Sequence, residues 1–72
     1  MKISYDRETD SLTITLRHEP IGESDVIGPD VIADLAADGR IVRFEILRAS
    51  QLVEDPDRVT LEIAEPVVAM RR

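Results

Sequence analysis

Hydrophobic and polar residues alternate in several short segments of this chain. The alternation is clearest in residues 3–5, 12–16, 31–36, 41–47 and 59–63. Because a strand points successive side chains to opposite faces, this period of two predicts strands with one apolar and one polar face. A shorter edge strand is predicted for residues 23–27, which lie between a Pro-Ile-Gly segment and Gly28-Pro29.

The dipeptide Asp38-Gly39 lies between two of these segments and predicts a tight hairpin. It is a strong signal for a two-residue type I′ turn, in which both central residues have positive φ. The apolar pairs across that hairpin are then Leu35 with Val42, Ala33 with Phe44, and Val31 with Ile46. Asp34 lies opposite Arg43 on the other face, as a pair of opposite charges. A shift by one residue would disrupt both patterns, because it moves every side chain to the other face.

A second hairpin is predicted at the N-terminus, where Ile3 lies opposite Ile14 and Tyr5 opposite Leu12. The rest of the chain is predicted to contain one helical turn at residues 49–53, a charged linker at 54–57, a strand at 59–63 and an apolar run at 67–70. The last run is either a further strand or a segment that needs a partner. These elements predict an α+β fold that is mostly β, an antiparallel β-meander of four to five strands with one short helix.

The length of the chain limits the core that it can build. Seventy-two residues form one domain, residues 1–72, and a chain of this size buries only about 60% of its unfolded surface. There is no cysteine, so disulfides cannot add stability and self-association is the remaining route. Ile32, Ile41 and Leu47 lie on the polar face of the central hairpin, where the C-terminal segment would cover them within the chain or in exchange with a second copy. We therefore expect a homo-oligomer, most simply a dimer.

The balance of charges narrows the class of partner. The formal net charge is −6, from 15 acidic and 9 basic side chains. Nucleic acid and anionic membranes are bound through clustered Lys and Arg, so neither is expected as the main partner. An acidic surface favours encounter with a small basic protein, although the same charge also simply keeps a small domain soluble. No apolar run reaches the roughly 20 residues of a membrane helix and no signal peptide follows Met1-Lys2, so we expect a cytoplasmic protein.

Two features of the sequence suggest a metal site or a catalytic residue, namely an acidic loop and a single histidine. Both lack the other residues that such a site requires. Asp6, Glu8 and Asp10 have the spacing of the first ligands of a calcium loop, but Ser11 and Arg17 stand where that loop needs glycine and glutamate. Asp6 and Asp10 are instead predicted to accept hydrogen bonds from loop amides. The single histidine, His18, has no nucleophile motif and no thiolate beside it. We therefore predict no enzyme activity, no catalytic residue, no metal and no cofactor.

Glu45 is the carboxylate whose position is most unusual, because it lies among apolar residues opposite Ile32. A carboxylate in the middle of a strand can act as an acid or a base when its pKa is raised. Arg43 lies two residues away on the same face, so we favour an ion pair between Glu45 and Arg43 over a catalytic role. Tyr5 and Phe44 are both assigned to the inner face, away from any nucleic acid. The residues predicted to contact a partner are Asp34, Glu45 and Glu62.

The first fifty residues resemble the YuzE-like family, small bacterial domains of unknown function. The matching residues are Ile3-Ser4-Tyr5-Asp6, Asp10, Leu12 to Leu16, Ile32 to Asp34, Asp38-Gly39-Arg40, Phe44 to Leu47 and Ala49-Ser50. Thr13 and Arg43 depart from the pattern, where an aromatic residue and a glycine are common. The resemblance implies a small sheet with little helix. Residues 51–72 are not part of the shared pattern and are interpreted, from their periodicity alone, as a C-terminal extension that can supply an extra strand at a dimer interface.

Relatives of this kind look like the antitoxin halves of bacterial toxin–antitoxin pairs, in which a small acidic protein neutralises a small basic ribonuclease. The resemblance therefore implies a non-catalytic protein-interaction module, an antitoxin-like binder of a small basic protein. The alternative from the residues themselves is an enzyme or a small-ligand or metal-binding protein. Its site would form between subunits of a homo-oligomer, from Asp6, Asp10 or His18.

Overall fold

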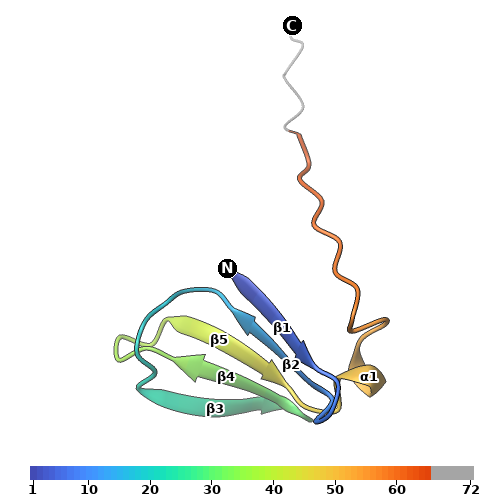
Figure 1. Ribbon diagram of the computed structural model, residues 1–72. Helices are drawn as coiled ribbons and strands as arrows, with labels where there is room; N and C mark the ends of the chain where they lie inside the picture. The colour runs from blue at the N-terminus through green and yellow to red at the C-terminus, as the bar shows by residue number, and fades with distance from the viewer. Residues whose placement is uncertain (66–72) are drawn as a thin grey trace, which may run out of the picture.

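In the computed structural model, residues 1–65 are described, and they form a single open sheet with one short helix (Figure 1). The strands are β1 (Lys2–Asp6), β2 (Ser11–Thr15), β3 (Glu23–Gly28), β4 (Val31–Leu35) and β5 (Ile41–Ile46), and the helix is α1 (Ala49–Leu52). All neighbouring strands are antiparallel, in the spatial order β1-β2-β5-β4-β3. The predicted fold class, mostly β with five strands and one short helix, is confirmed.

The order of the strands in space departs from that of a simple meander at one connection. β1 and β2 form the predicted N-terminal hairpin, with Ile3 opposite Ile14 and Tyr5 opposite Leu12. Residues 16–22 then carry the chain past the ends of β5 and β4 to the far edge of the sheet, where β3 begins. The N–H of Gly22 donates to the carbonyl of Leu35 at 2.7 Å at the end of this crossover.

The central hairpin, β4–β5, has most of the predicted register but a different turn. Val31 lies opposite Ile46, Ala33 opposite Phe44 and Asp34 opposite Arg43, as predicted. The type I′ turn is wrong, because only Gly39 of the two central residues has a positive φ, at 89°. The N–H of Gly39 donates to the carbonyl of Ala36, and the N–H of Ala36 donates to the carbonyl of Arg40. These bonds define a three-residue loop, which is the next most common hairpin connection.

A β-bulge in β5 compensates for the longer loop. The loop places Leu35 opposite Ile41 rather than the predicted Val42, and the register shifts between Leu35 and the next pair, Asp34 with Arg43. One extra residue in one strand is what defines a bulge. The bulge therefore returns the pairing to the predicted register, so that the charged pair and the apolar ladder both form. It also removes Ile41 from the polar face, where the sequence had predicted it.

The crossover, residues 16–22, is hydrogen-bonded to β5 at the bulge. Val42 is buried, and its carbonyl accepts hydrogen bonds from the backbone N–H groups of Leu16 at 2.8 Å and Arg17 at 3.3 Å. The crossover is thus attached to β5 at its beginning and to β4, through Gly22, at its end. A Cβ atom on Gly22 would lie 3.3 Å from the backbone of Ala37, so the absence of a side chain permits this close approach.

The sheet has one apolar and one polar face, and the apolar face has no second layer over most of its area. The strand residues on the apolar face include Ile3, Tyr5, Leu12, Ile14, Val31, Ala33, Leu35, Phe44 and Ile46. Among residues 1–65, the buried hydrophobic residues are Leu12, Ala33, Ala36, Val42 and Ala49. The larger side chains of this face, such as Ile14 and Phe44, are only half-buried. A sheet normally buries its apolar face against another layer, so this face is incomplete in the single chain.

The chain leaves the sheet after α1. Ala49 is fully buried, and its N–H donates to the carbonyl of Asp10, which holds α1 at one end of the sheet. Beyond it, residues 58–65, here named the tail, run away from the sheet (Figure 1). The strand predicted at residues 59–63 is wrong for the single chain, because this segment lies beside no other strand. The apolar run predicted at residues 67–70 lies outside the described residues.

Candidate functional site

Two of the three predicted contact residues lie together on the polar face of the sheet. Asp34 on β4 and Glu45 on β5 flank Arg43, which lies directly opposite Asp34. The third residue, Glu62, lies in the tail, away from this cluster, and is exposed. The candidate site is therefore built by the central hairpin, with one further member, Ser24, from β3.

The carboxylate of Asp34 is the centre of this cluster. Its residue is only 1% exposed, and it accepts hydrogen bonds from Arg43 Nε at 2.7 Å and Ser24 Oγ at 2.5 Å. Arg43 also reaches Glu45 with a second guanidinium nitrogen, at 3.5 Å, which confirms the predicted ion pair. One arginine thus bridges two acidic side chains across the middle of the sheet.

The pKa values of Asp34 and Glu45 are shifted in opposite directions. Burial raises the pKa of Asp34, but hydrogen bonds from Glu45, Ser24 and Arg43 outweigh it and hold that pKa below its ordinary value. The pKa of Glu45 is raised, first by its hydrogen bond to Asp34, then by burial and by the charge of Asp34. Two acidic groups that share a site disfavour each other's ionisation, and here the group with more hydrogen-bond donors, Asp34, has the lowered pKa.

Within this cluster, the side chains of Glu45 and Arg43 are accessible from outside the chain, whereas that of Asp34 is not. The side chains of Glu45 and Arg43 are each 35% exposed, whereas the carboxylate of Asp34 is enclosed by its own partners. Thr13 and Thr15 of β2 lie directly opposite Glu45 and Arg43 and extend the polar surface. Asp34 therefore acts by holding Arg43 in place.

A second polar cluster joins the first loop to the helix. The hydroxyl of Tyr5 donates to Asp10 at 2.6 Å, and Asp10 also accepts from the Ser50 hydroxyl at 2.6 Å and the Ser50 N–H at 3.0 Å. Hydrogen bonds from Ser50 and Tyr5 lower the pKa of Asp10, and the bond to Asp10 raises the pKa of Tyr5. The sequence singled out these three residues separately, and nothing in their spacing signalled that they meet.

The acidic loop has a structural role within the chain. Asp6 accepts hydrogen bonds from the N–H groups of Glu8 at 2.9 Å and Thr9 at 3.3 Å, so the prediction that it binds loop amides is confirmed. For Asp10 the prediction is wrong in its partner, because Asp10 accepts from the amide of Ser50 in α1 and not from an amide of its own loop. Within residues 1–65, no three acidic or histidine side chains are grouped closely enough to hold a metal ion. His18 is exposed in the crossover after β2, whereas Asp6 and Asp10 precede that strand. One chain therefore does not bring these three residues together.

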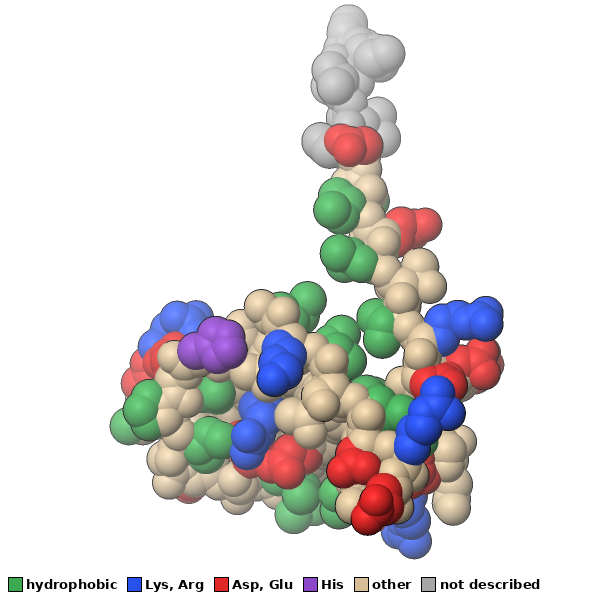
Figure 2. Space-filling view, viewed as in Figure 1, with side chains coloured by type: hydrophobic (Ala, Val, Ile, Leu, Met, Phe, Trp, Pro, Cys, Tyr) green, Lys and Arg blue, Asp and Glu red, His purple; other side chains and the backbone are tan. Residues whose placement is uncertain are grey.

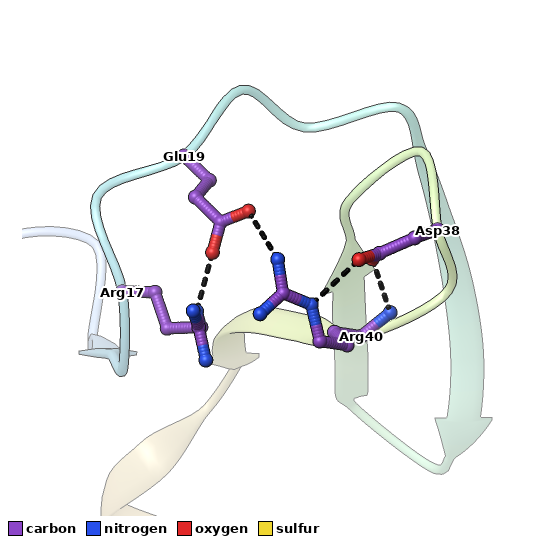
Figure 3. Close-up of polar contacts among 4 residues, drawn as sticks. All are labelled: Arg17, Glu19, Asp38 and Arg40. Carbon is purple, nitrogen blue, oxygen red and sulfur yellow. Dashed lines mark hydrogen bonds and ion pairs between the residues drawn. The ribbon is translucent and has the colours of Figure 1, made fainter.

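A third network fastens the crossover to the loop of the central hairpin. Glu19 binds Arg17 with one carboxylate oxygen and Arg40 with the other, the latter at 2.9 Å (Figure 3). Arg40 also binds Asp38 at 2.7 Å, and the N–H of Arg40 donates to the same carboxylate. The acidic residue of the Asp-Gly dipeptide thus orders the loop through its side chain.

Ion pairs within the fold leave an acidic excess on its surface. Within residues 1–65, five arginines form ion pairs with acidic side chains of the same chain, namely Arg7, Arg17, Arg40, Arg43 and Arg48. Glu23 and Asp25 of β3 are both exposed, and they lie opposite Leu35 and Ala33. They therefore form an acidic border along one edge of the apolar face.

Comparison with protein families assigns the chain to a family of unknown function. The family model described as "Protein of unknown function (DUF2283)" matches residues 2–50, and the chain belongs to this family. The match covers all five strands and ends at Ser50, so the cluster of Tyr5, Asp10 and Ser50 falls within it. The YuzE-like name is compatible with this result and stays a prediction. No curated protein and no solved structure matches the chain significantly.

The part of the chain that the structure describes contains no helix of the length and apolar character needed to span a membrane.

Proposed function

We propose that this protein is a non-catalytic protein-interaction module that binds a small basic protein, in the manner of an antitoxin. The observation that carries the proposal is the apolar face of the sheet, which is half-exposed in the single chain and bordered by Glu23 and Asp25. A partner that covers this face would supply the missing second layer.

The free energy for such binding would come from the apolar face. Burial of apolar surface contributes about 25 cal/mol for each Å² removed from water, and Ile14 and Phe44 at the centre of the face are only partly covered. Flat association of two sheets or of a sheet with a helix is the ordinary way to complete such a layer. This face is therefore the proposed contact surface.

The acidic residues would select the partner. Five arginines of residues 1–65 are engaged with acidic residues of the same chain, and none of these ion pairs involves Glu23 or Asp25, so this border favours lysine or arginine from another protein. Opposite charges at the rim of an interface chiefly speed association and exclude wrong partners. The predicted contacts Asp34 and Glu45 lie on the opposite, polar face, so a partner that covers the apolar face would not touch them. Glu62 of the tail is exposed and stays a proposed contact.

The test is to purify the chain from its native cell together with its neighbours, in low and in moderate salt. We expect a basic protein to be retained in stoichiometric amount and to bind less tightly as salt increases. The variant Glu23→Lys/Asp25→Lys should weaken this binding at least tenfold. The matched control is Val26→Lys on the same strand, because Val26 is exposed but lies opposite Ile32 on the polar face.

Two outcomes would contradict the proposal. A homo-oligomer that retains a metal or a metabolite and no protein would favour a site between subunits. Binding of the basic protein that is insensitive to the Glu23 and Asp25 variant would show that this face is not the contact surface.

A further inference from the structure

The tail has the pattern of a strand without a neighbour. Val59, Leu61 and Ile63 are 58%, 75% and 76% exposed and alternate with Thr60 and Glu62. Figure 2 shows hydrophobic side chains, in green, along one side of the tail. Within residues 1–65, no backbone hydrogen bond joins residues 59–65 to another segment. Three adjacent large apolar side chains in water are unfavourable, so we expect the tail to be covered when the protein is assembled.

The edge strand β1 is a surface that such a strand fits. β1 pairs with β2 on one side only, so the backbone groups of its other side are free to bind a further strand. Ile3, on the apolar face of β1, is 39% exposed. Addition of a strand at this edge would extend the apolar face beyond Ile3 and cover that side chain.

We take the register of the pairing from an ion pair that lies within one chain in the structure and that would form between copies after exchange. Arg7 directly follows β1, Asp57 directly precedes the tail, and the two form an ion pair at 2.8 Å. An antiparallel pairing that continues from this contact places Val59 opposite Tyr5 and Leu61 opposite Ile3. All four of these residues are apolar or aromatic, and both β1 residues lie on the apolar face.

The same register also matches the polar residues. Thr60 falls opposite Ser4, and Glu62 falls opposite Lys2, which gives a pair of hydroxyl groups and a pair of opposite charges on the polar face. A shift of two residues towards the start of β1 or towards its end would lose the charge pair. In this one register, each residue from 59 to 62 lies opposite a residue of matching character in β1.

The other edge of the sheet is a poorer fit. β3 carries Glu23 and Asp25 on the apolar face, so a strand added there would place its apolar side chains beside two carboxylates. Its pairing with β4 is also interrupted between Val26 and Gly28, and an irregular edge strand is a common defence against strand addition. Charge and regularity both favour β1.

From these observations we propose that the tail of one copy adds as a strand to the β1 edge of a second copy, and that the exchange is reciprocal. The tail points away from its own sheet although Asp57 is fastened beside its own β1 (Figure 1). Asp55 has a φ of 46° directly before Pro56, a strained combination for a residue that precedes proline. Short strained connections of this kind favour exchange of an element between copies. This contact goes beyond the proposed binding of a basic protein, because it uses a different edge and a different partner.

The first test uses cysteine cross-linking, which is unambiguous because the chain has no cysteine. Chains with Ser4→Cys are mixed with chains with Thr60→Cys and oxidised. Directly opposite residues in an antiparallel pair have Cα atoms about 4.5–5.5 Å apart, within the range of a disulfide. We expect a covalent dimer that contains one chain of each kind. The matched control, Val26→Cys with Thr60→Cys, should give at least tenfold less of it.

A chain with both substitutions distinguishes exchange between copies from pairing of the tail with its own β1. If Ser4→Cys/Thr60→Cys forms its disulfide inside a single chain that sediments as a monomer, the tail binds its own β1 and the proposal is overturned. Covalent dimers from the doubly substituted chain support it.

The second test is the oligomeric state of the full chain by sedimentation. We expect the wild type to be a dimer at micromolar concentration. The dissociation constant of the dimer should be at least tenfold higher for Leu61→Asp than for the wild type, and unchanged for the control Val26→Asp. Lys2→Glu should weaken the dimer, and Lys2→Glu/Glu62→Lys should restore it. A wild-type monomer at high micromolar concentration, or a dimer indifferent to Leu61→Asp, would overturn the proposal. Binding of the basic protein, measured separately with the Leu61→Asp chain, shows whether the proposed function stands without the exchange.

Discussion

The central hairpin and the tail have the same alternation of apolar and polar residues, yet only the hairpin is paired. In β4–β5, Ala33 lies opposite Phe44 and Asp34 opposite Arg43, so both faces of the hairpin have partners. In the tail, Leu61 is 75% exposed and no strand lies beside it. The difference shows that alternation makes a segment able to form a strand, and that a matching neighbour at the correct distance along the chain makes it form one.

The connection before each segment explains the difference. The hairpin is closed by a three-residue loop in which Gly39 has the left-handed conformation, so its two strands are joined at once. The tail follows Asp55 and Pro56, which direct the chain away from the sheet. Loop geometry therefore decides whether the neighbouring strand comes from the same chain or, as we propose, from a second copy.

The largest expected effect is the loss of the carboxylate at the centre of the hairpin. Asp34→Ala leaves Arg43 and Ser24 without their shared acceptor, so we expect the free energy of unfolding to fall by about 2–3 kcal/mol. Arg17→Ala, which removes an ion pair at an exposed site, should cost less than about 1 kcal/mol. Urea denaturation of both variants would measure the difference. Equal losses would show that the hairpin does not depend on its polar face.

The second effect concerns the loop that closes the hairpin. Gly39→Val forces a β-branched residue to adopt a φ of 89°, and we expect a loss of about 1–2 kcal/mol in the free energy of unfolding. The control is Gly28→Val, because a Cβ at Gly28 has open space around it and that residue does not have a positive φ. Thermal unfolding of the two variants checks this prediction, which fails if Gly28→Val is the more destabilised.

A smaller effect is expected in the dependence of stability on pH. The pKa of Asp34 is lowered by folding, so its contribution is present above its unfolded pKa of about 3.9 and is lost as the pH falls through its folded pKa. The pKa of Glu45 is raised, so its contribution is present below its unfolded pKa of about 4.3 and is lost as the pH rises through its folded pKa.

Glu45→Gln isolates the second of these contributions. The amide stays neutral and can still donate a hydrogen bond to Asp34, so the loss on raising the pH should disappear. Between pH 4 and pH 7 we expect the variant to gain stability relative to wild type, by less than about 1 kcal/mol because Glu45 is partly exposed. Denaturation curves at several pH values measure this gain, and a constant difference between the two proteins would refute it.

The smallest effect is expected in the tail of the monomer. Leu61→Ser should change the free energy of unfolding by less than about 0.5 kcal/mol at concentrations low enough to separate the copies, since Leu61 is exposed there. Phe44→Ser, on the central hairpin, is the comparison and should destabilise clearly. A large loss from Leu61→Ser under these conditions would mean that the tail packs on its own sheet.

The register of the hairpin was predictable, but the way in which the chain achieves it was not. The apolar ladder and the opposite charges of Asp34 and Arg43 identify one pairing, and the structure has it from Val31 to Asp34, whereas Leu35 lies opposite Ile41 instead of Val42. The sequence favours a two-residue turn at Asp38-Gly39, and the same dipeptide is equally suited to a three-residue loop with glycine in the left-handed position. Attachment of the crossover at Val42 accompanies the longer loop and the bulge, and pattern reasoning does not include that contact.

The candidate site was predicted in part, for a similar reason. Asp34, Arg43 and Glu45 follow from the register, because they are neighbours on one face of a hairpin. Ser24 was missed, since the register of β3 against β4 depends on how the crossover brings β3 to the edge. The meeting of Tyr5, Asp10 and Ser50 was also missed, because Ser50 is forty residues from Asp10 and only the folded sheet brings α1 to the first loop.

The alternation of residue types determined which segments can form strands, which face of each is apolar and how the two hairpins pair over most of their length, because these properties depend on contacts close along the chain. Only the tertiary structure decided that β2 lies beside β5, that Asp34 is buried beneath its own partners, and that residues 59–63 have no neighbouring strand among residues 1–65. Those outcomes depend on where the crossover and the linker direct the backbone, which is set by contacts between segments distant in sequence.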